Sequence, residues 1–177
     1  SETTSPEEIV QLAAKTPFVA DDYNAFRNEL GRANSLMFFF DNAGEILFDA
    51  LLVERLLAVR PSLKIVGVVR KEPIFNDATT EDAEAAGLRG RIELLDCGIE
   101  TLGAPLHACP ADFQKRFLDC DMVLAKGQAS YETIEAELAP GQPFAGKSVY
   151  FLLMVKCEVV SSALGVPVGT AVLHKEA

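Results

Sequence analysis

The fold is decided by residues 36–45, LMFFFDNAGE, in which an apolar run leads directly into a polar segment. An uninterrupted apolar run that is bounded by polar residues is typical of a strand buried on both faces. Strands of this kind belong to parallel sheets that are covered by helices on both sides. In such sheets, ligands bind beyond the carboxyl ends of the strands. The stretch therefore predicts a fold class and also the place where a site is expected.

The rest of the chain repeats this alternation of apolar runs and helical patterns. Further strands are predicted at residues 64–69, 92–95, 122–125, 148–155 and 170–173. Helices are predicted at residues 44–59, 78–86, 110–118 and 130–137. Strands that alternate with helices predict an α/β fold, a three-layer α/β/α sandwich with a mostly parallel sheet.

The chain of 177 residues divides into two predicted parts. Residues 34–177 show no internal repeat and no linker composition, which predicts a single α/β domain. Residues 1–33 are predicted to be a short helical N-terminal extension. Its first helix begins with a capping-box pattern at residues 5–8, and its second follows Asp21 or Asp22 and ends at Gly31.

Composition excludes several classes of protein. The 16 Lys and Arg against 26 Asp and Glu give a net charge of −10, which argues against a nucleic-acid partner. No apolar run approaches the roughly 20 residues of a membrane helix, and no signal peptide pattern opens the chain. The four cysteines form no C-x-x-C pair, which favours free thiols in a reducing compartment. We therefore expect a cytoplasmic protein with no membrane partner.

Polar side chains follow four of the predicted strands where each strand ends. Because the carboxyl ends of parallel strands meet at one edge of a sheet, we expect these side chains to converge. Asp41, Asn42 and Asp77 offer oxygen ligands, which suit a hard cation such as Mg²⁺ or Mn²⁺. Lys126 and Lys156 would then offset the charge of a phosphoryl group beside that cation.

Two glycines and two missing motifs refine this prediction. Gly44 and Gly127 stand near predicted helix starts, where backbone N–H groups can approach an anion. The chain contains neither a GxxxxGK[ST] phosphate loop nor a GxGxxG motif, so a P-loop ATPase and a standard dinucleotide-binding domain lose support.

Each of these residues also has a purely structural interpretation. The Asp41-Asn42 pair and Asp77 precede predicted helices and could serve as N-caps. Single lysines at strand ends are more often solvated than functional. The convergence favours the functional interpretation, because separate caps need not supply both ligand charge and counter-charge.

Four motifs together resemble a known family. They are DNAGEILFD at residues 41–49, PIFNDATTEDA at 73–83, KGQASYET at 126–133 and Lys-Cys at 156–157. In order and rough spacing, from residue 18 to 173, they resemble the DUF89 family, also called damage-control phosphatases. The resemblance implies a metal-dependent phosphatase that hydrolyses phosphomonoesters of small metabolites, such as sugar phosphates or phosphopantetheine derivatives.

The resemblance also implies roles for individual residues. The metal ligands of the family fall on Asp41, Asn42 and Asp77, and the metal is expected to be Mn²⁺, Mg²⁺, Co²⁺ or Ni²⁺. The nucleophile is either a metal-activated water or Asp41 itself. The phosphate-binding lysine falls on Lys156. Further substrate contacts are expected from Gly44, Glu45, Asn76 and Lys126.

One departure from the family pattern concerns the region before Asp41. Relatives usually place a substantial helical domain there, whereas 40 residues precede Asp41 in this chain. Residues 1–33 would be a remnant of that domain, and a homo-oligomer or a partner chain would supply the missing helical region. Two alternatives to the phosphatase stay open. One is an S-adenosylmethionine-dependent protein carboxyl methyltransferase, and the other is a non-catalytic metal-binding subunit that needs a partner chain.

Overall fold

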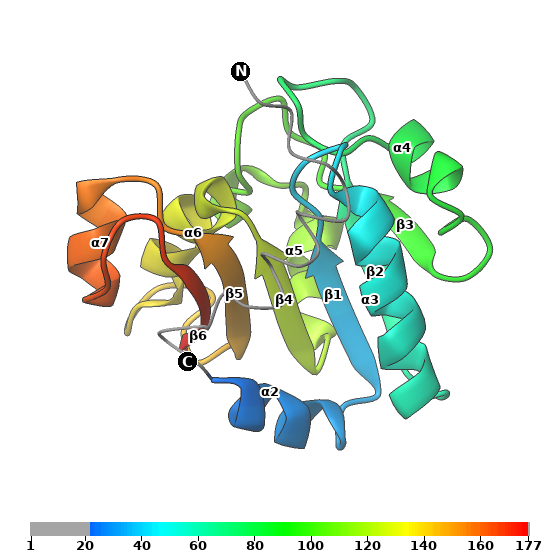
Figure 1. Cartoon of the computed structure of the whole chain (residues 1–177), viewed down its shortest axis with the longest axis horizontal. Helices are drawn as coiled ribbons and strands as arrows, with labels where there is room; N and C mark the ends of the chain where they lie inside the picture. Colours follow the sequence, from blue (N-terminus) through cyan, green and yellow to red (C-terminus); the bar gives the residue numbers. More distant parts are fainter. Residues whose placement is uncertain (1–21, 177) are drawn as a thin grey trace, which may run out of the picture.

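The computed structural model describes residues 22–176, and its centre is a sheet with the strand order β3-β2-β1-β4-β5-β6 (Figure 1). The strands are β1 (Ser35–Phe39), β2 (Lys64–Val69), β3 (Glu93–Asp96), β4 (Met122–Lys126), β5 (Val149–Met154) and β6 (Ala171–Glu176). The first five strands are parallel, and β6 is antiparallel to β5. The predicted mostly parallel sheet is confirmed.

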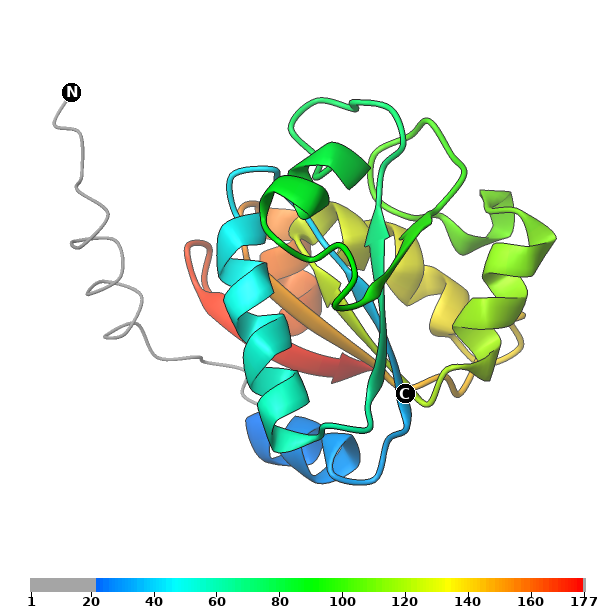
Figure 2. The same ribbon diagram turned by 90° about the vertical axis from the view of Figure 1, so that its right-hand side faces the viewer.

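Helices cover both faces of this sheet. They are α2 (Tyr23–Leu30), α3 (Ile46–Val59), α4 (Thr80–Ala85), α5 (Ala111–Asp119), α6 (Gln128–Ile134) and α7 (Glu158–Leu164), with short 3-10 helices η1 (Leu106–Ala108) and η2 (Glu135–Leu138). Figure 2 shows the sheet nearly edge-on, with α3 on one side and α5 on the other. The predicted three-layer sandwich is confirmed.

The central strand β1 is apolar throughout because it packs on both sides. Phe38 is fully buried in one cluster with Ile46 of α3. Phe39 points to the other face, where its ring lies 6.0 Å from that of Phe113 and 6.2 Å from that of Phe117, both on α5. Full burial of a phenylalanine contributes about 1.5–3 kcal/mol, so both faces of the strand stabilise the sandwich.

Helix α2 is the part of the predicted N-terminal extension that the structure describes. It lies at the amino-terminal end of the strands (Figures 1 and 2), and its buried Phe26 and Leu30 belong to the same core cluster as Leu36 and Tyr150. The capping box predicted at residues 5–8 lies outside the described residues. The boundary between extension and domain at residue 33 stays a prediction.

Helices α6 and α7 differ from the sequence analysis, and so does strand β6, which continues to Glu176, beyond its predicted end at residue 173. Helix α7 was not predicted, because its sequence EVVSSAL contains two valines and two serines, which form helices less readily than Ala, Leu or Glu. The helix predicted at residues 130–137 begins earlier, at Gln128, and its second half is the 3-10 helix η2. No helix in the described part of the chain is long and apolar enough to cross a membrane.

The strand order fixes where a site is expected. Strand β1 lies between β2 and β4. The chain runs from β1 to β2 and β3 on one side and then crosses to β4 on the other side. The carboxyl ends of β1 and β4, at the upward-pointing arrowheads in Figure 1, therefore form a topological switch point.

Candidate active site

Asp41 and Gly127 meet where β1 and β4 end. Gly127 has a φ of +83°, a conformation that glycine adopts without strain, and its backbone N–H donates to the carbonyl of Leu152 at 3.1 Å. A Cβ atom at this position would overlap with the carboxyl group of Asp41. The absence of a side chain at residue 127 thus makes room for the Asp41 carboxylate.

The loops that follow β1 and β2 are joined by backbone hydrogen bonds. Asn42 and Asp77 form an isolated antiparallel bridge, and the N–H of Ala78 donates to the carbonyl of Asp41 at 2.7 Å. The N–H of Ala43 donates to the carbonyl of Asn76 at 2.8 Å. The three predicted metal ligands, from two different loops, are therefore brought side by side.

The side chain of Asn42 connects these loops to the start of α3. Its Nδ2 donates to Oδ2 of Asp41 at 3.0 Å and to Oε1 of Glu45 at 2.8 Å. Its Oδ1 accepts a short hydrogen bond from Nδ2 of Asn76. Four predicted site residues, Asp41, Asn42, Glu45 and Asn76, thus form one hydrogen-bonded group.

The structure excludes the helix-cap interpretation of the acidic residues. The N-cap of α3 is Glu45, and its side chain makes no capping hydrogen bond. The N-cap of α4 is Thr79, which forms a reciprocal capping box with Asp82. Neither the Asp41-Asn42 pair nor Asp77 therefore serves as a helix N-cap.

Lys126, at the end of β4, is held by two carboxylates. Its Nζ donates to Oε2 of Glu45 at 2.7 Å and to Oδ1 of Asp49 at 2.8 Å. Burial alone would lower the pKa of Lys126, but Asp49 and Glu45 raise it above its usual value. The lysine is therefore a cation at neutral pH.

Both negatively and positively charged side chains surround Asp41. Burial raises its pKa, the carboxylates of Glu45 and Asp77 raise it further, and Lys126 and Lys156 partly offset them. A bound cation would relieve the repulsion between these carboxylates. The site fits a hard divalent cation, because Asp41, Asp77 and the amide oxygen of Asn42 are all oxygen donors.

This donor set relies on only two carboxylates. Within residues 22–176, no group of three or more His, Cys, Asp and Glu side chains is arranged to hold a metal. One or two carboxylates are the usual protein contribution to a Mg²⁺ site that also binds phosphate oxygens. Asp41, Asp77 and the amide oxygen of Asn42 could therefore supply the protein part of a metal site that leaves positions for other ligands.

A cavity of about 320 Å³ opens beside Asp41. Its charged lining consists of Asp41, Glu45, Lys126 and Lys156, and its aliphatic lining consists of Leu152, Leu153, Met154 and Ala171. Lys156 is exposed, and its backbone N–H donates to Oε1 of Gln128 at 2.8 Å. Both predicted phosphate-binding lysines therefore border the same cavity.

Two predicted contact residues lie apart from this cavity. Gly44 is exposed in the turn before α3, and Asn76 is exposed in the loop after β2. Neither residue lines this cavity or the small one on the other side of Asp41. Their contacts with substrate stay predictions.

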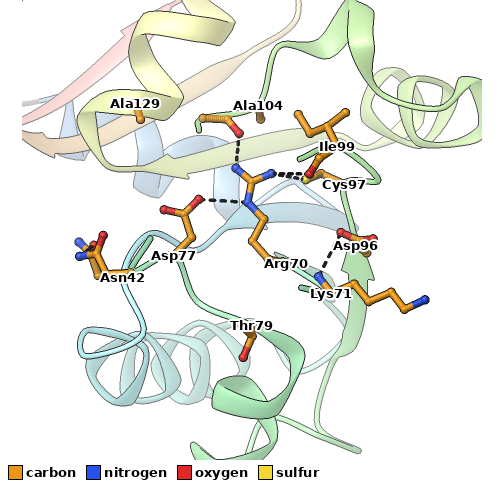
Figure 3. Close-up of polar contacts among 12 residues, drawn as sticks. Asn42, Arg70, Lys71, Asp77, Thr79, Asp96, Cys97, Ile99, Ala104 and Ala129 are labelled. Atoms are coloured by element: carbon orange, nitrogen blue, oxygen red, sulfur yellow. Dashed lines mark hydrogen bonds and ion pairs between the residues drawn. The ribbon is translucent and has the colours of Figure 1, made fainter. Parts of the chain in front are cut away.

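Two buried charges of the site were not singled out from the sequence. The guanidinium of Arg70, a residue 7% exposed, donates from Nε to Oδ2 of Asp77 at 3.0 Å. It also donates from Nη1 to Sγ of Cys97 at 2.6 Å (Figure 3), and from Nη2 to the carbonyl of Gly103. The other charge is Asp49, which pairs with Lys126.

Signals for both residues were present in the sequence. Arg70 follows the apolar run of β2 directly, in the same position that Asp41 and Lys126 take at their strands. Asp49 interrupts the buried stripe of α3 that Ile46 and Val53 define. A charged residue inside an otherwise apolar pattern indicates a buried charge of this kind.

Comparison with known proteins agrees with this architecture. Residues 1–172 match the family model of the damage-control phosphatase ARMT1-like domain. Damage-control phosphatase PH1575 of Pyrococcus horikoshii is 35% identical over 167 residues, which are 94% of this chain and 55% of that protein. A damage-control phosphatase of Archaeoglobus fulgidus is 37% identical over 142 residues, which are 79% of this chain and 46% of that protein.

A solved structure shows the same fold. The crystal structure of a DUF89 family protein from Pyrococcus horikoshii matches with a TM-score of 0.87 and 31% identity, covering 99% of this chain and 60% of that one. This chain thus spans about half the length of the curated relatives that it matches. The resemblance that the four motifs indicated is confirmed, and the chain belongs to the DUF89 family, with a damage-control phosphatase ARMT1-like domain.

Proposed function

We propose that this chain is a metal-dependent phosphatase that hydrolyses phosphomonoesters of small metabolites. The observation that carries the proposal is the convergence of three oxygen donors and two lysines at the carboxyl ends of four strands. Two related proteins that bear the name damage-control phosphatase support the reaction class.

Asp41, Asn42 and Asp77 would hold Mg²⁺, Mn²⁺, Co²⁺ or Ni²⁺, and the bound metal would polarise the oxygens of the phosphoryl group. Lys126 and Lys156 border the same cavity and would offset the charge of these oxygens in the transition state. The net charge of −10 does not oppose an anionic substrate, because a bound divalent cation together with Lys126 and Lys156 would make the local field at this edge of the sheet positive.

Asp41 can take part in two ways. It can attack phosphorus directly, forming an aspartyl phosphate while the ester oxygen leaves and takes up a proton, after which water releases phosphate. Alternatively, water attacks the ester in a single step and Asp41 acts only as a ligand. Rapid acid quench followed by mass spectrometry of the peptide that contains Asp41 distinguishes the two routes, because only the first leaves phosphate on the protein.

The proposal is tested with an aryl phosphate and each of the four metals in turn. Asp41→Ala is expected to abolish metal-dependent phosphate release, and Lys156→Met to reduce it about 10- to 1000-fold, because a charge-stabilising group is lost. Asp119→Ala, which removes an exposed carboxylate on α5, serves as the control and should keep full activity. Undiminished release by Asp41→Ala would contradict the proposal.

The phosphate-release assay also tests whether the chain needs a partner chain and which substrate it hydrolyses. If the chain binds Mn²⁺ but releases phosphate only after a second polypeptide is added, it is a subunit rather than an independent enzyme. A panel of phosphorylated metabolites, assayed with the most active metal, would then identify the substrate.

A further inference from the structure

Helix α3 carries a carboxylate on the face that packs against the sheet. Asp49 is only 3% exposed and lies in the same buried stripe as Ile46 and Val53. Transfer of a carboxylate into such a position costs several kcal/mol unless it is well paired. The Asp49 carboxylate therefore needs a specific partner that offsets the free-energy cost of its burial.

The hydrogen bonds of Asp49 are one-sided. Its Oδ1 accepts from Nζ of Lys126 at 2.8 Å. Its Oδ2 is buried, and no hydrogen-bond partner for it occurs among residues 22–176. A carboxylate that served only to stabilise the fold would normally have partners for both oxygens. Lys126 is therefore the partner that the Asp49 carboxylate binds.

The two carboxylates that hold Lys126 differ in their exposure to solvent. The side chain of Glu45 is 47% exposed, whereas that of Asp49 is 4% exposed and fixed in the helix interface. These two bonds use two of the three N–H groups of the ammonium. No acceptor within the described residues takes the third, and the lysine borders the cavity that Asp41 also lines.

We propose that Asp49 is a positioning residue, which holds the Lys126 ammonium at the cavity so that its remaining N–H meets the phosphoryl oxygens of the substrate. This inference rests on the proposed function. Asp49 is not part of the cavity lining, so it would act through Lys126 rather than through contact with substrate.

A double-mutant cycle tests whether Asp49 acts through Lys126. Asp49→Asn keeps the shape of the side chain and should lower kcat/KM about 10- to 100-fold, because a displaced catalytic contact loses this much. Lys126→Met should lower it at least as far. The double variant should be no worse than Lys126→Met alone. Asp119→Asn, which breaks an exposed Asp–Lys pair on α5, is the matched control and should leave kcat/KM unchanged.

Two kinetic results would overturn the inference. One is full kcat/KM in Asp49→Asn, and the other is a double variant whose loss is the product of the two single losses. Calorimetric titration with Mn²⁺ alone should give the same affinity for wild type and Asp49→Asn. A large loss of Mn²⁺ affinity would show that Asp49 supports the metal ligands instead.

An NMR measurement separates this inference from the proposed function and does not require a folded variant at position 49. An ammonium group gives a detectable signal only when it is held and protected from exchange, so wild-type protein should show one that disappears in Lys126→Met. Its absence from wild type would contradict the positioning of Lys126 even in an active enzyme. If no phosphomonoester is hydrolysed while the signal is present, the proposed function fails but the ion pair stands.

Discussion

At the scale of single residues, Gly127 decides whether the Asp41 carboxylate has room. Gly127→Ala should reduce phosphate release at least 100-fold, because the new methyl group occupies the space of that carboxylate. It should also lower the free energy of unfolding by roughly 1–3 kcal/mol, because alanine is strained at a φ of +83°. Urea unfolding and an aryl phosphate assay measure the two effects.

Gly169→Ala is the control for backbone strain alone. Gly169 has a φ of +85°, but a Cβ atom there meets nothing within 4 Å. This variant should show a loss of stability similar to that of Gly127→Ala while keeping its activity. Equal activities for the two variants would mean that the overlap with Asp41 is harmless.

Arg70 is the second residue whose replacement has a defined effect. Arg70→Met removes the buried cation that contacts Asp77, Cys97 and Gly103, and it leaves the Asp77 carboxylate without that partner. Breaking a buried pair from one side lowers the free energy of unfolding by about 3–5 kcal/mol. Urea unfolding should show a loss of this size.

Arg116→Met provides the comparison for a surface pair. Arg116 donates to Glu93 at 2.7 Å, but the two side chains are 36% and 56% exposed. Exposed pairs contribute about 0–1 kcal/mol. If Arg70→Met were as mild as Arg116→Met, the guanidinium would not hold the loops around Asp77 together.

At the scale of elements, α3 makes stability depend on pH through Asp49. Burial raises the pKa of Asp49 from 3.8 to about 6, although Lys126 opposes the shift. A carboxyl group whose pKa is raised by folding binds more protons in the folded state. Its contribution to stability is therefore present below about pH 4 and is lost as the pH rises through 6.

Asp49→Asn removes this titration, so the comparison with wild type isolates it. Between pH 4 and 7.5, the stability of Asp49→Asn relative to wild type should rise by up to about 3 kcal/mol, because each tenfold change in proton affinity on folding corresponds to roughly 1.4 kcal/mol. Urea unfolding of both proteins across this range, without added metal, measures the difference. Parallel curves would show that Asp49 has a normal pKa in the fold.

The elements also show what the sequence could and could not predict. Strands such as β1 and β2 were predicted to within a residue because strands buried on both faces are continuous apolar runs. The direction of β6 was not predicted, since composition carries no sign of strand direction. The place of Asp41 and Asp77 in a site, rather than at helix caps, could be decided only by tertiary structure, because caps and ligands use the same residue types.

At the scale of the whole molecule, a bound divalent metal should stabilise the folded state. Ligand binding to the folded state alone raises the free energy of unfolding by about 2.7 kcal/mol at 100 times the dissociation constant. Mn²⁺ should therefore raise the melting temperature of the wild type. Asp41→Asn and Asp77→Asn should lose this increase, and Asp119→Asn should retain it. A shift that survives in both site variants would place the metal elsewhere.

The central position of β1 between β2 and β4 also sets the order in which the site can appear during folding. Strands β1 and β2 are close in sequence, but Lys126 and Asp49 are 77 positions apart. Contacts between distant positions form slowly, because a long loop must close first. An early intermediate that contains only β1, α3 and β2 would have Asp41 and Asn42 but no lysine beside them. The two lysines would then join Asp41 only when β4 and β5 dock, so a nascent chain would complete the proposed phosphate site only after residue 156 had been synthesised.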